Sequence, residues 1–172
     1  MNGSKSSRTD AGEMRQLISF SVGEEEYGLE LLQVKEVIRM RKITWLPHAP
    51  RCVKGIFNLR GDVIPVMDLR ERFGLPSIEL TETTRVIVVE VAGRLVGLVV
   101  DSASQVVRLP ADQFDPPPPV MGKGAGDLIS GVGRMEDTLI ILIKVDGLLS
   151  MEERSQIEES LESAAKEPVP VS

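Results

Sequence analysis

The chain has 172 residues, of which 42% are hydrophobic and 27% are charged, and these proportions are typical of a globular protein with its own core. Its net charge of -6 argues against a nucleic-acid binder, which needs Lys and Arg to neutralise phosphates, and against attachment to an anionic membrane surface. With aromatic residues at only 3%, few rings are present to stack on bases.

The single cysteine, Cys52, excludes an intramolecular disulfide and a cysteine-based metal cluster, and it favours a reducing compartment. The N-terminal residues lack the apolar run of a signal peptide. No stretch reaches the roughly 18 apolar residues that are needed to span a membrane. We therefore expect a cytoplasmic protein with no segment inserted in the membrane.

The first half of the chain predicts short strands after a polar start. Residues 1–15 are rich in Ser, Gly and charge, so they are expected to be disordered. Residues 17–29 predict a β-hairpin with its turn at residues 23–26. A further strand is expected at 63–69, and a short helical turn at 68–73.

The second half continues the same pattern and ends in a helix. Residues 86–100 predict a hairpin that turns at Ala92-Gly93, and residues 139–145 predict another strand. A helix is expected from about 146 to 165, so that residues 151–172 form an acidic helix or tail. Strands therefore dominate, and the sequence predicts an all-β fold with short helices and a C-terminal helix.

An internal repeat organises these strands. Residues 17–39 align with residues 86–108, which places Gly28 on Gly97, and a second alignment places Gly55 on Gly131. This pattern is typical of two similar units in tandem. About five strands per unit suffice for a small closed barrel without exposed edges. Residues 16–150 are therefore predicted to form two interlocked, five-stranded barrels that pack on one another.

The groups that catalysis requires are sparse. The only histidine, His48, lies in the proline-rich connector 46–50. Cys52 is near it, but a small buried residue is a better interpretation than a Cys-His pair. Residues 122–127, GKGAGD, lack the spacing of a phosphate loop and predict an ordinary loop, and Glu24–Glu26 predict a solvated tip. We expect no catalytic residue, no cofactor and no metal site.

The most distinctive stretch is FNLRGDVIPVMDLRERFG, residues 57–74. It sets Asn58-Leu59-Arg60-Gly61 at a corner between two apolar runs. Gly61 permits backbone angles that a side chain would resist, so the corner can turn and direct Arg60 outward. On residue types alone, an arginine here favours a surface ion pair worth no more than about 1 kcal/mol.

Several segments together resemble the bacterial chemotaxis coupling protein family, CheW. The similarity runs from about Gln16 to Leu149, and its specific part is G-x-x-N-L-R-G followed by I-P-V-x-D-L-R. The other matching segments are Tyr27-Gly28, VKEVIR at 34–39, Leu46-Pro47 and VGLVVD at 96–101. The resemblance implies two packed five-stranded SH3-like barrels and a non-catalytic adaptor that is cytoplasmic and recruited to membrane-bound chemoreceptor arrays.

The same resemblance implies partners. The adaptor would join the cytoplasmic helical hairpin tip of chemoreceptors to the histidine kinase CheA, whose regulatory domain has this fold, and it would self-associate in array rings. Glu36 and Arg60 would lie near each other at the receptor-contacting groove. There the planar fork of Arg60 can hold Glu36 and still reach polar groups of a docked helix.

Six further positions are candidates for the receptor-binding or kinase-binding surface by the same resemblance. Val34 and Ile56 are expected beside the charged pair, and Val86 and Gly97 on the second barrel, with core packing as the alternative for each. Gly55 and Gly131 either admit a neighbouring backbone or mark bulges, and neither is assigned to a receptor or kinase face.

Other interpretations stay open at this point. The chain could be a CheW-like domain of a related chemosensory pathway, or a fragment of a larger coupling-receiver protein, although a receiver needs about a hundred residues more. A small β-barrel enzyme or nucleic-acid binder is a more distant alternative. The run Pro116–Pro119 and the acidic tail match nothing that the resemblance explains.

Overall fold

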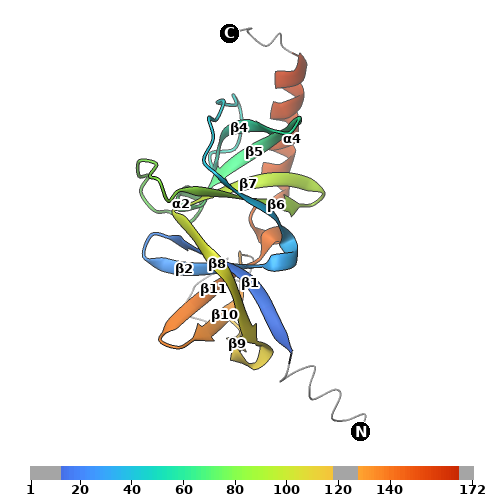
Figure 1. The fold of residues 1–172 in the computed structure, drawn as a ribbon. Coiled ribbons are helices and arrows are strands. Elements are labelled where there is room, and N and C mark those ends of the chain that lie inside the picture. The colour runs from blue at the N-terminus through green and yellow to red at the C-terminus, as the bar shows by residue number, and fades with distance from the viewer. Residues whose placement is uncertain (1–12, 118–127, 167–172) are drawn as a thin grey trace.

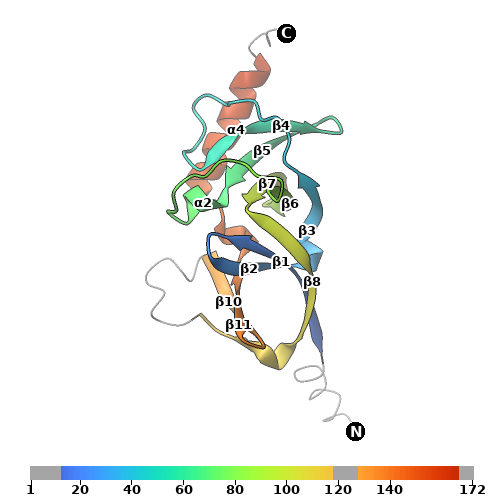
Figure 2. The same cartoon turned by 60° about the vertical axis from the view of Figure 1, so that its left-hand side comes forward.

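The computed structural model describes residues 13–117 and 128–166, which form two β-sheets placed one above the other (Figures 1 and 2). The lower sheet has six strands in the order β8-β1-β2-β11-β10-β9, and the upper sheet has five in the order β3-β6-β7-β5-β4. The strands of the lower sheet are β1 (Met14–Val22), β2 (Glu25–Glu30), β8 (Ser102–Pro110), β9 (Phe114–Asp115), β10 (Ile129–Met135) and β11 (Thr138–Ile143). Those of the upper sheet are β3 (Val34–Arg39), β4 (Val53–Leu59), β5 (Asp62–Asp68), β6 (Arg85–Val91) and β7 (Arg94–Val100).

The two sheets exchange hairpins between the halves of the sequence. The hairpin β1-β2 of the first half pairs with β8 and β11 of the second half. In return, the hairpin β6-β7 of the second half pairs with β3 and β5 of the first. The repeat therefore predicts the strands and their hairpins, whereas each sheet draws on both repeat units. This exchange interlocks the two barrels, because neither sheet can form from one half alone.

Each sheet is closed into a barrel by the segment that follows one of its edge strands, β3 in the upper sheet and β8 in the lower. After β3, Thr44 forms an isolated bridge with Ile56 of β4, with N···O distances of 2.8 and 2.7 Å. After β8, the chain makes one 3₁₀ turn at Ala111–Gln113, and β9 then pairs with β10. The predicted all-β fold of two SH3-like barrels is confirmed by this architecture. The predicted count of five strands holds for the upper sheet, whereas the two-residue strand β9 gives the lower sheet six.

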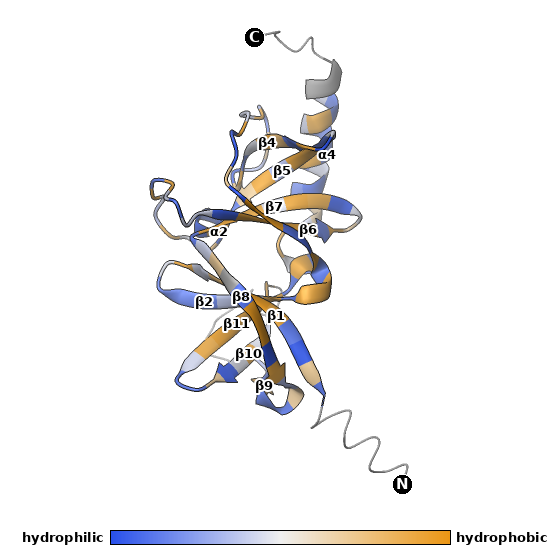
Figure 3. Ribbon diagram, viewed as in Figure 1, coloured by the Kyte–Doolittle hydropathy of each residue, from blue (hydrophilic) through white to orange (hydrophobic). Residues whose placement is uncertain are grey.

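The core has three parts because the strands alternate. Val86 and Val88 of β6 face the interior of the upper barrel, whereas Ile87 and Val89 of the same strand face the layer between the barrels. A third cluster around Leu17 fills the lower barrel. Figure 3 shows β6 and β7 as largely apolar ribbons. Strands covered on both faces explain why these runs are almost continuously apolar in sequence.

A salt-bridged latch joins the two barrels at Asp101. Arg70, in the short helix α2 (Leu69–Arg72), donates from Nε and Nη2 to the two carboxylate oxygens at 2.9 and 2.7 Å. The backbone N–H of Gly23, in the β1-β2 turn, donates to the same carboxylate at 2.8 Å. One carboxylate thus connects a turn of the lower barrel to a helix of the upper barrel.

The C-terminal helix α4 (Met151–Lys166) runs beside the upper barrel (Figure 1). It begins in a capping box, in which Ser150 N–H donates to Glu153 Oε1 at 2.9 Å and Glu153 N–H donates to Ser150 Oγ at 3.1 Å. Its inner face buries Ile157. No helix in the described parts of the chain is both long and apolar enough to cross a bilayer.

Several predicted boundaries are corrected. The first turn is shorter than residues 23–26, since Glu25 and Glu26 already belong to β2. The strand β1 starts at Met14, so the last residues of the segment 1–15 are ordered in the sheet. The last strand stops at Ile143, and a 3₁₀ turn at Val145–Gly147 precedes α4. The predicted loop at 122–127 lies outside the described residues, as do residues 118 and 119 of the proline run.

Candidate functional site

Arg60 and Gly61 form the two-residue turn between β4 and β5. Both have positive φ, 51° and 93°, as a type I′ hairpin turn requires. The side chain of Asn58 stabilises the turn by accepting a hydrogen bond from the Gly61 N–H at 2.8 Å. Glycine adopts this conformation freely, but an arginine adopts it at some cost. The backbone therefore holds Arg60 at the tip of the hairpin.

The turn brings Arg60 to Glu36 of β3, as predicted. A single nitrogen, Nη2, donates to both carboxylate oxygens of Glu36, at 2.5 and 2.6 Å. The Arg60 side chain stays 70% exposed, against 22% for Glu36. Within residues 13–117 and 128–166, its Nε and Nη1 have no hydrogen-bond partner, so this part of the guanidinium can meet a second molecule.

Both groups of the pair are charged at neutral pH. The hydrogen bond from Arg60 lowers the pKa of Glu36, against a smaller opposing effect of desolvation, and the charges of Arg60 and Arg41 lower it further. The hydrogen bond to Glu36 in turn raises the pKa of Arg60. A docking partner therefore meets a fixed zwitterionic pair with an additional cation, Arg41, nearby.

The apolar candidates divide between two surfaces. Ile56 is partly exposed on the outer face of the β4-β5 ribbon. It lines a groove of about 720 Å³ with Gly61, Asp62 and other residues. Val34 instead packs against the core between the barrels. The structure thus brings Ile56 to the groove beside the turn, and it does not bring Val34 there.

Val86 and Gly97 lie inside the upper barrel. Val86 is 2% exposed, and a Cβ atom on Gly97 would approach Val86 Cγ1 to 2.8 Å. The hairpin exchange places both residues on the same barrel as Arg60, so their predicted position on the second barrel is wrong. Their burial corresponds to the alternative of core packing that the sequence left open.

Gly55 and Gly131 perform equivalent roles in closing the two barrels. A Cβ atom on Gly55 would lie 2.3 Å from the carbonyl oxygen of Thr44, and one on Gly131 would lie 2.7 Å from that of Asp115. Each glycine also sits at a register shift in its strand pair. Both predicted interpretations, a close backbone approach and a bulge, therefore apply to the same two positions.

His48 and Cys52, the two residues considered for catalysis from the sequence, do not form a reactive pair. His48 is exposed on a turn, while Cys52 is buried and donates to Glu153 Oε2 at 3.7 Å. Burial, followed by the charge of Glu153, raises the pKa of the Cys52 thiol to about 11. Among the described residues, no three His, Cys, Asp or Glu side chains are grouped so that they could hold a metal ion.

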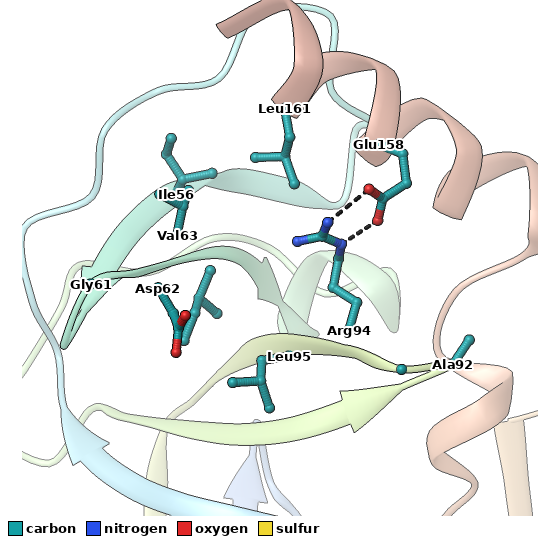
Figure 4. A pocket seen from close by; sticks show the side chains of 11 residues that line it. Ile56, Gly61, Asp62, Val63, Ala92, Arg94, Leu95, Glu158 and Leu161 are labelled. Atoms are coloured by element: carbon teal, nitrogen blue, oxygen red, sulfur yellow. Dashed lines mark hydrogen bonds and ion pairs between the residues drawn. The ribbon is translucent and has the colours of Figure 1, made fainter. Parts of the chain in front are cut away.

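Other residues around the turn escaped the sequence interpretation. Val63 belongs to an apolar run that predicts a buried strand, yet it is 46% exposed and lines the groove with Ile56. Leu95 and Leu161 line the same groove from β7 and from α4 (Figure 4). Residues 63–67 are apolar throughout, so the sequence does not indicate which of them is exposed, and nothing in the sequence indicates that α4 contributes to the groove.

Comparison with known proteins gives consistent matches over most of the chain. The family model described as CheW-like domain matches residues 16–153. The chain is 35% identical over 144 residues to the chemotaxis protein CheW of Klebsiella aerogenes, covering 84% of this chain and 87% of that protein. It is 32% identical over 136 residues to CheW of Bacillus subtilis, covering 79% and 87%.

Relatives with other names also match, and a solved structure agrees in fold. Protein PilI of Pseudomonas aeruginosa is 31% identical over 124 residues, covering 72% of this chain and 70% of that protein. The crystal structure of the scaffolding protein TtCheW from Thermoanaerobacter tengcongensis superimposes with a TM-score of 0.75 at 35% identity. The match covers 82% of this chain and 96% of the solved one.

Proposed function

The chain belongs to the CheW-like family and is a chemotaxis coupling adaptor, and we propose that it works without catalysis. In this proposal it joins the cytoplasmic tip of chemoreceptors to the regulatory domain of the histidine kinase CheA. Its place would be the cytoplasmic receptor array, where copies of the adaptor and the kinase domain assemble side by side. The names of the relatives and of the solved scaffold support this role.

One observation carries the receptor half of the proposal. Arg60 is held at the tip of a hairpin, bound to Glu36 through one nitrogen, and is otherwise open to solvent. An arginine that only stabilised the fold would gain little from such an exposed pair. A docked helix would receive hydrogen bonds from the free Nε and Nη1, which set its register, while apolar contacts nearby supply affinity.

The kinase half of the proposal rests on architecture. The regulatory domain of the kinase is expected to share the two-barrel fold, so that the two proteins can form pseudo-symmetric contacts in a ring. None of the candidate residues is assigned to that contact by its geometry. We therefore assign the receptor contact to the Glu36–Arg60 pair, and we assign the kinase contact to the two barrels without naming residues.

The proposal predicts that Arg60→Ala and Glu36→Ala each weaken receptor association by about tenfold or more, because each removes a charged partner at the contact. The measurement is a pull-down with a chemoreceptor signalling fragment and CheA, combined with a kinase assay. Circular dichroism checks that the variants are folded.

Arg134→Ala is the matched control, because Arg134 forms an exposed ion pair with Asp115 at 3.0 Å on the other barrel. It should leave receptor association unchanged. If the wild-type protein binds neither receptor nor kinase, the adaptor role is wrong. If it binds both and all three variants behave alike, the Glu36–Arg60 pair is not the receptor contact.

A further inference from the structure

The connection between β3 and β4 concentrates positive charge in a chain that is acidic overall. Residues 37–61 contain six Lys and Arg residues and no Asp or Glu, although the net charge of the protein is -6. Three of the six, Arg39, Arg41 and Lys42, lie at the end of β3 and just beyond it, and all three are exposed. In the part of the chain that the structure describes, their side chains form no hydrogen bond or ion pair. Their charges are therefore available to a second molecule.

Trp45, the only tryptophan of the chain, is exposed in the same connection. It is 74% exposed, whereas the next residue, Leu46, is buried. The preceding residue, Thr44, is held by two backbone hydrogen bonds to Ile56, at 2.8 and 2.7 Å. The indole ring is thus presented to solvent by an ordered segment. Trp and Arg are enriched among the residues that dominate protein–protein contacts, so residues 39–45, which we call the basic loop, have the composition of a binding surface.

The carboxylates of α4 divide between two faces of the helix. Glu153 and Glu158 face the upper barrel, where they accept hydrogen bonds from Arg72 at 2.8 Å and from Arg94 at 2.7 Å (Figure 4). Ile157 lies between these two pairs and is buried. Because the two ion pairs and Ile157 fix the rotation of α4 about its own axis, they also determine which residues form its outer face.

Three carboxylates occupy that outer face. Glu152, Glu159 and Glu162 are exposed, and their spacing of seven and three residues places them on one side of a helix with 3.6 residues per turn. Over the described ranges of the chain, their side chains make no hydrogen bond or ion pair. This acidic row is opposite in charge to the three cations of the basic loop.

The basic loop and the acidic row lie at the same end of the molecule. Figures 1 and 2 show the β3-β4 connection and α4 at the end of the upper barrel that points away from the lower barrel. The two surfaces do not pair within one chain, because the acidic row faces away from the barrel that carries the loop. Two copies that meet end to end about a two-fold axis can place each acidic row against the basic loop of the other copy, so that the contact forms twice.

We propose that two copies of this chain associate end to end through these surfaces, with each acidic row against the other copy's basic loop and Trp45 covered at the contact. Charge complementarity between two unpaired surfaces of one chain identifies the occupant as a second copy. The inference does not rest on the receptor contact, and an end-to-end dimer differs from the side-by-side assembly of an array. Since exposed ion pairs are individually weak, the dimer is transient and depends on salt.

Charge reversal tests the proposal through complementation. The loop variant carries Arg39→Glu and Lys42→Glu, and the helix variant carries Glu159→Lys and Glu162→Lys. Each variant alone brings like charges together at both contacts of the dimer, whereas a mixture of the two variants restores opposite charges at both. Sedimentation velocity at low ionic strength measures the association over a range of protein concentrations.

We expect the sedimentation coefficient of the wild type to rise with protein concentration, and this rise to disappear at about 0.5 M salt, where exposed charges are strongly screened. The loop and helix variants should each associate at least about tenfold more weakly than the wild type, and their equimolar mixture should recover the wild-type affinity to within about threefold. Trp45→Ala should weaken association by about fivefold or more.

The matched control combines Arg108→Glu with Arg134→Glu, which reverses two exposed cations of the lower barrel and changes the net charge as the loop variant does. It should associate as the wild type does. A wild-type protein that stays monomeric at every concentration would overturn the proposal. A mixture of the loop and helix variants that associates no better than either alone would also overturn it, as would an equal loss in the control. Thermal melts confirm that each variant is folded.

Discussion

Gly55→Ala is expected to lower the free energy of unfolding by about 3 kcal/mol, because the new methyl group has no space. It would lie 2.3 Å from the Thr44 carbonyl oxygen and 2.5 Å from Ile43 Cγ2. The obstacle is largely backbone, which cannot rotate away as a side chain can. To relieve the contact, the closing segment must move, and this breaks the two hydrogen bonds between Thr44 and Ile56, which contribute about 1 kcal/mol each.

Urea unfolding measures this effect, and Gly131→Ala provides a graded comparison. There the contact with the Asp115 carbonyl oxygen is 2.7 Å, so a smaller loss, about 2 kcal/mol, is expected. Ser130→Ala, at the exposed neighbour of Gly131, should change stability by less than about 0.5 kcal/mol. A Gly55→Ala variant that unfolds at the same urea concentration as the wild type would show that barrel closure does not depend on this glycine.

Asp101→Asn is expected to cost about 2 kcal/mol at neutral pH, because it removes the charge to which Arg70 and the Gly23 N–H donate. Both side chains are mostly covered, with 15% of Arg70 and 20% of Asp101 exposed. Removing the Asp101 charge leaves the mostly covered Arg70 guanidinium without an opposite charge between the barrels.

The interactions of Asp101 with Arg70 and Gly23 also predict that the stability of the fold depends on pH. Burial raises the pKa of Asp101, but the hydrogen bonds from Arg70 and from Gly23 N–H, with the charge of Arg70, outweigh burial and hold the pKa below its ordinary value of 3.8. The folded state therefore binds this proton less tightly than the unfolded state. The stabilisation is complete above the unfolded pKa and is lost as the pH falls through the folded pKa.

Unfolding experiments at neutral pH and at progressively lower pH test this directly. The difference in stability between wild type and Asp101→Asn should shrink as the pH falls below about 4. Asp137→Asn, at the exposed β10-β11 turn, is the control and should show little difference at any pH. A difference between wild type and Asp101→Asn that stays constant with pH would contradict the role of the Asp101 charge.

Much of the fold could be predicted because it depends on local patterns. Alternating apolar runs and glycine turns predict the hairpins 17–29 and 86–100, and the coincidence of Gly55 with Gly131 indicates a shared structural task. The hairpin exchange could not be predicted, since strand periodicity does not say which strands pair across the chain. For this reason Val86 and Gly97 were expected on a different barrel from Arg60.

The candidate site was predicted only in part, for a similar reason. The corner Asn58–Gly61 is encoded by neighbouring residues, and the family resemblance supplied its partner Glu36. The groove, by contrast, is assembled from β4, β5, β7 and α4, so Val63 and Leu161 become neighbours only through tertiary packing. The Arg70–Asp101 latch was missed likewise, because its residues are 31 positions apart.

The most direct test of the receptor contact is a charge exchange, in which Glu36→Arg and Arg60→Glu are made singly and together. The affinity of each variant for a chemoreceptor cytoplasmic fragment is measured by isothermal titration. The double variant can restore an ion pair within the protein, but it presents the opposite charge to the receptor. If Arg60 is a recognition residue, the double variant folds normally and still binds at least about tenfold more weakly than the wild type. If the double variant regains the wild-type affinity that the single variants lose, the pair only stabilises the hairpin, and the receptor contact lies elsewhere.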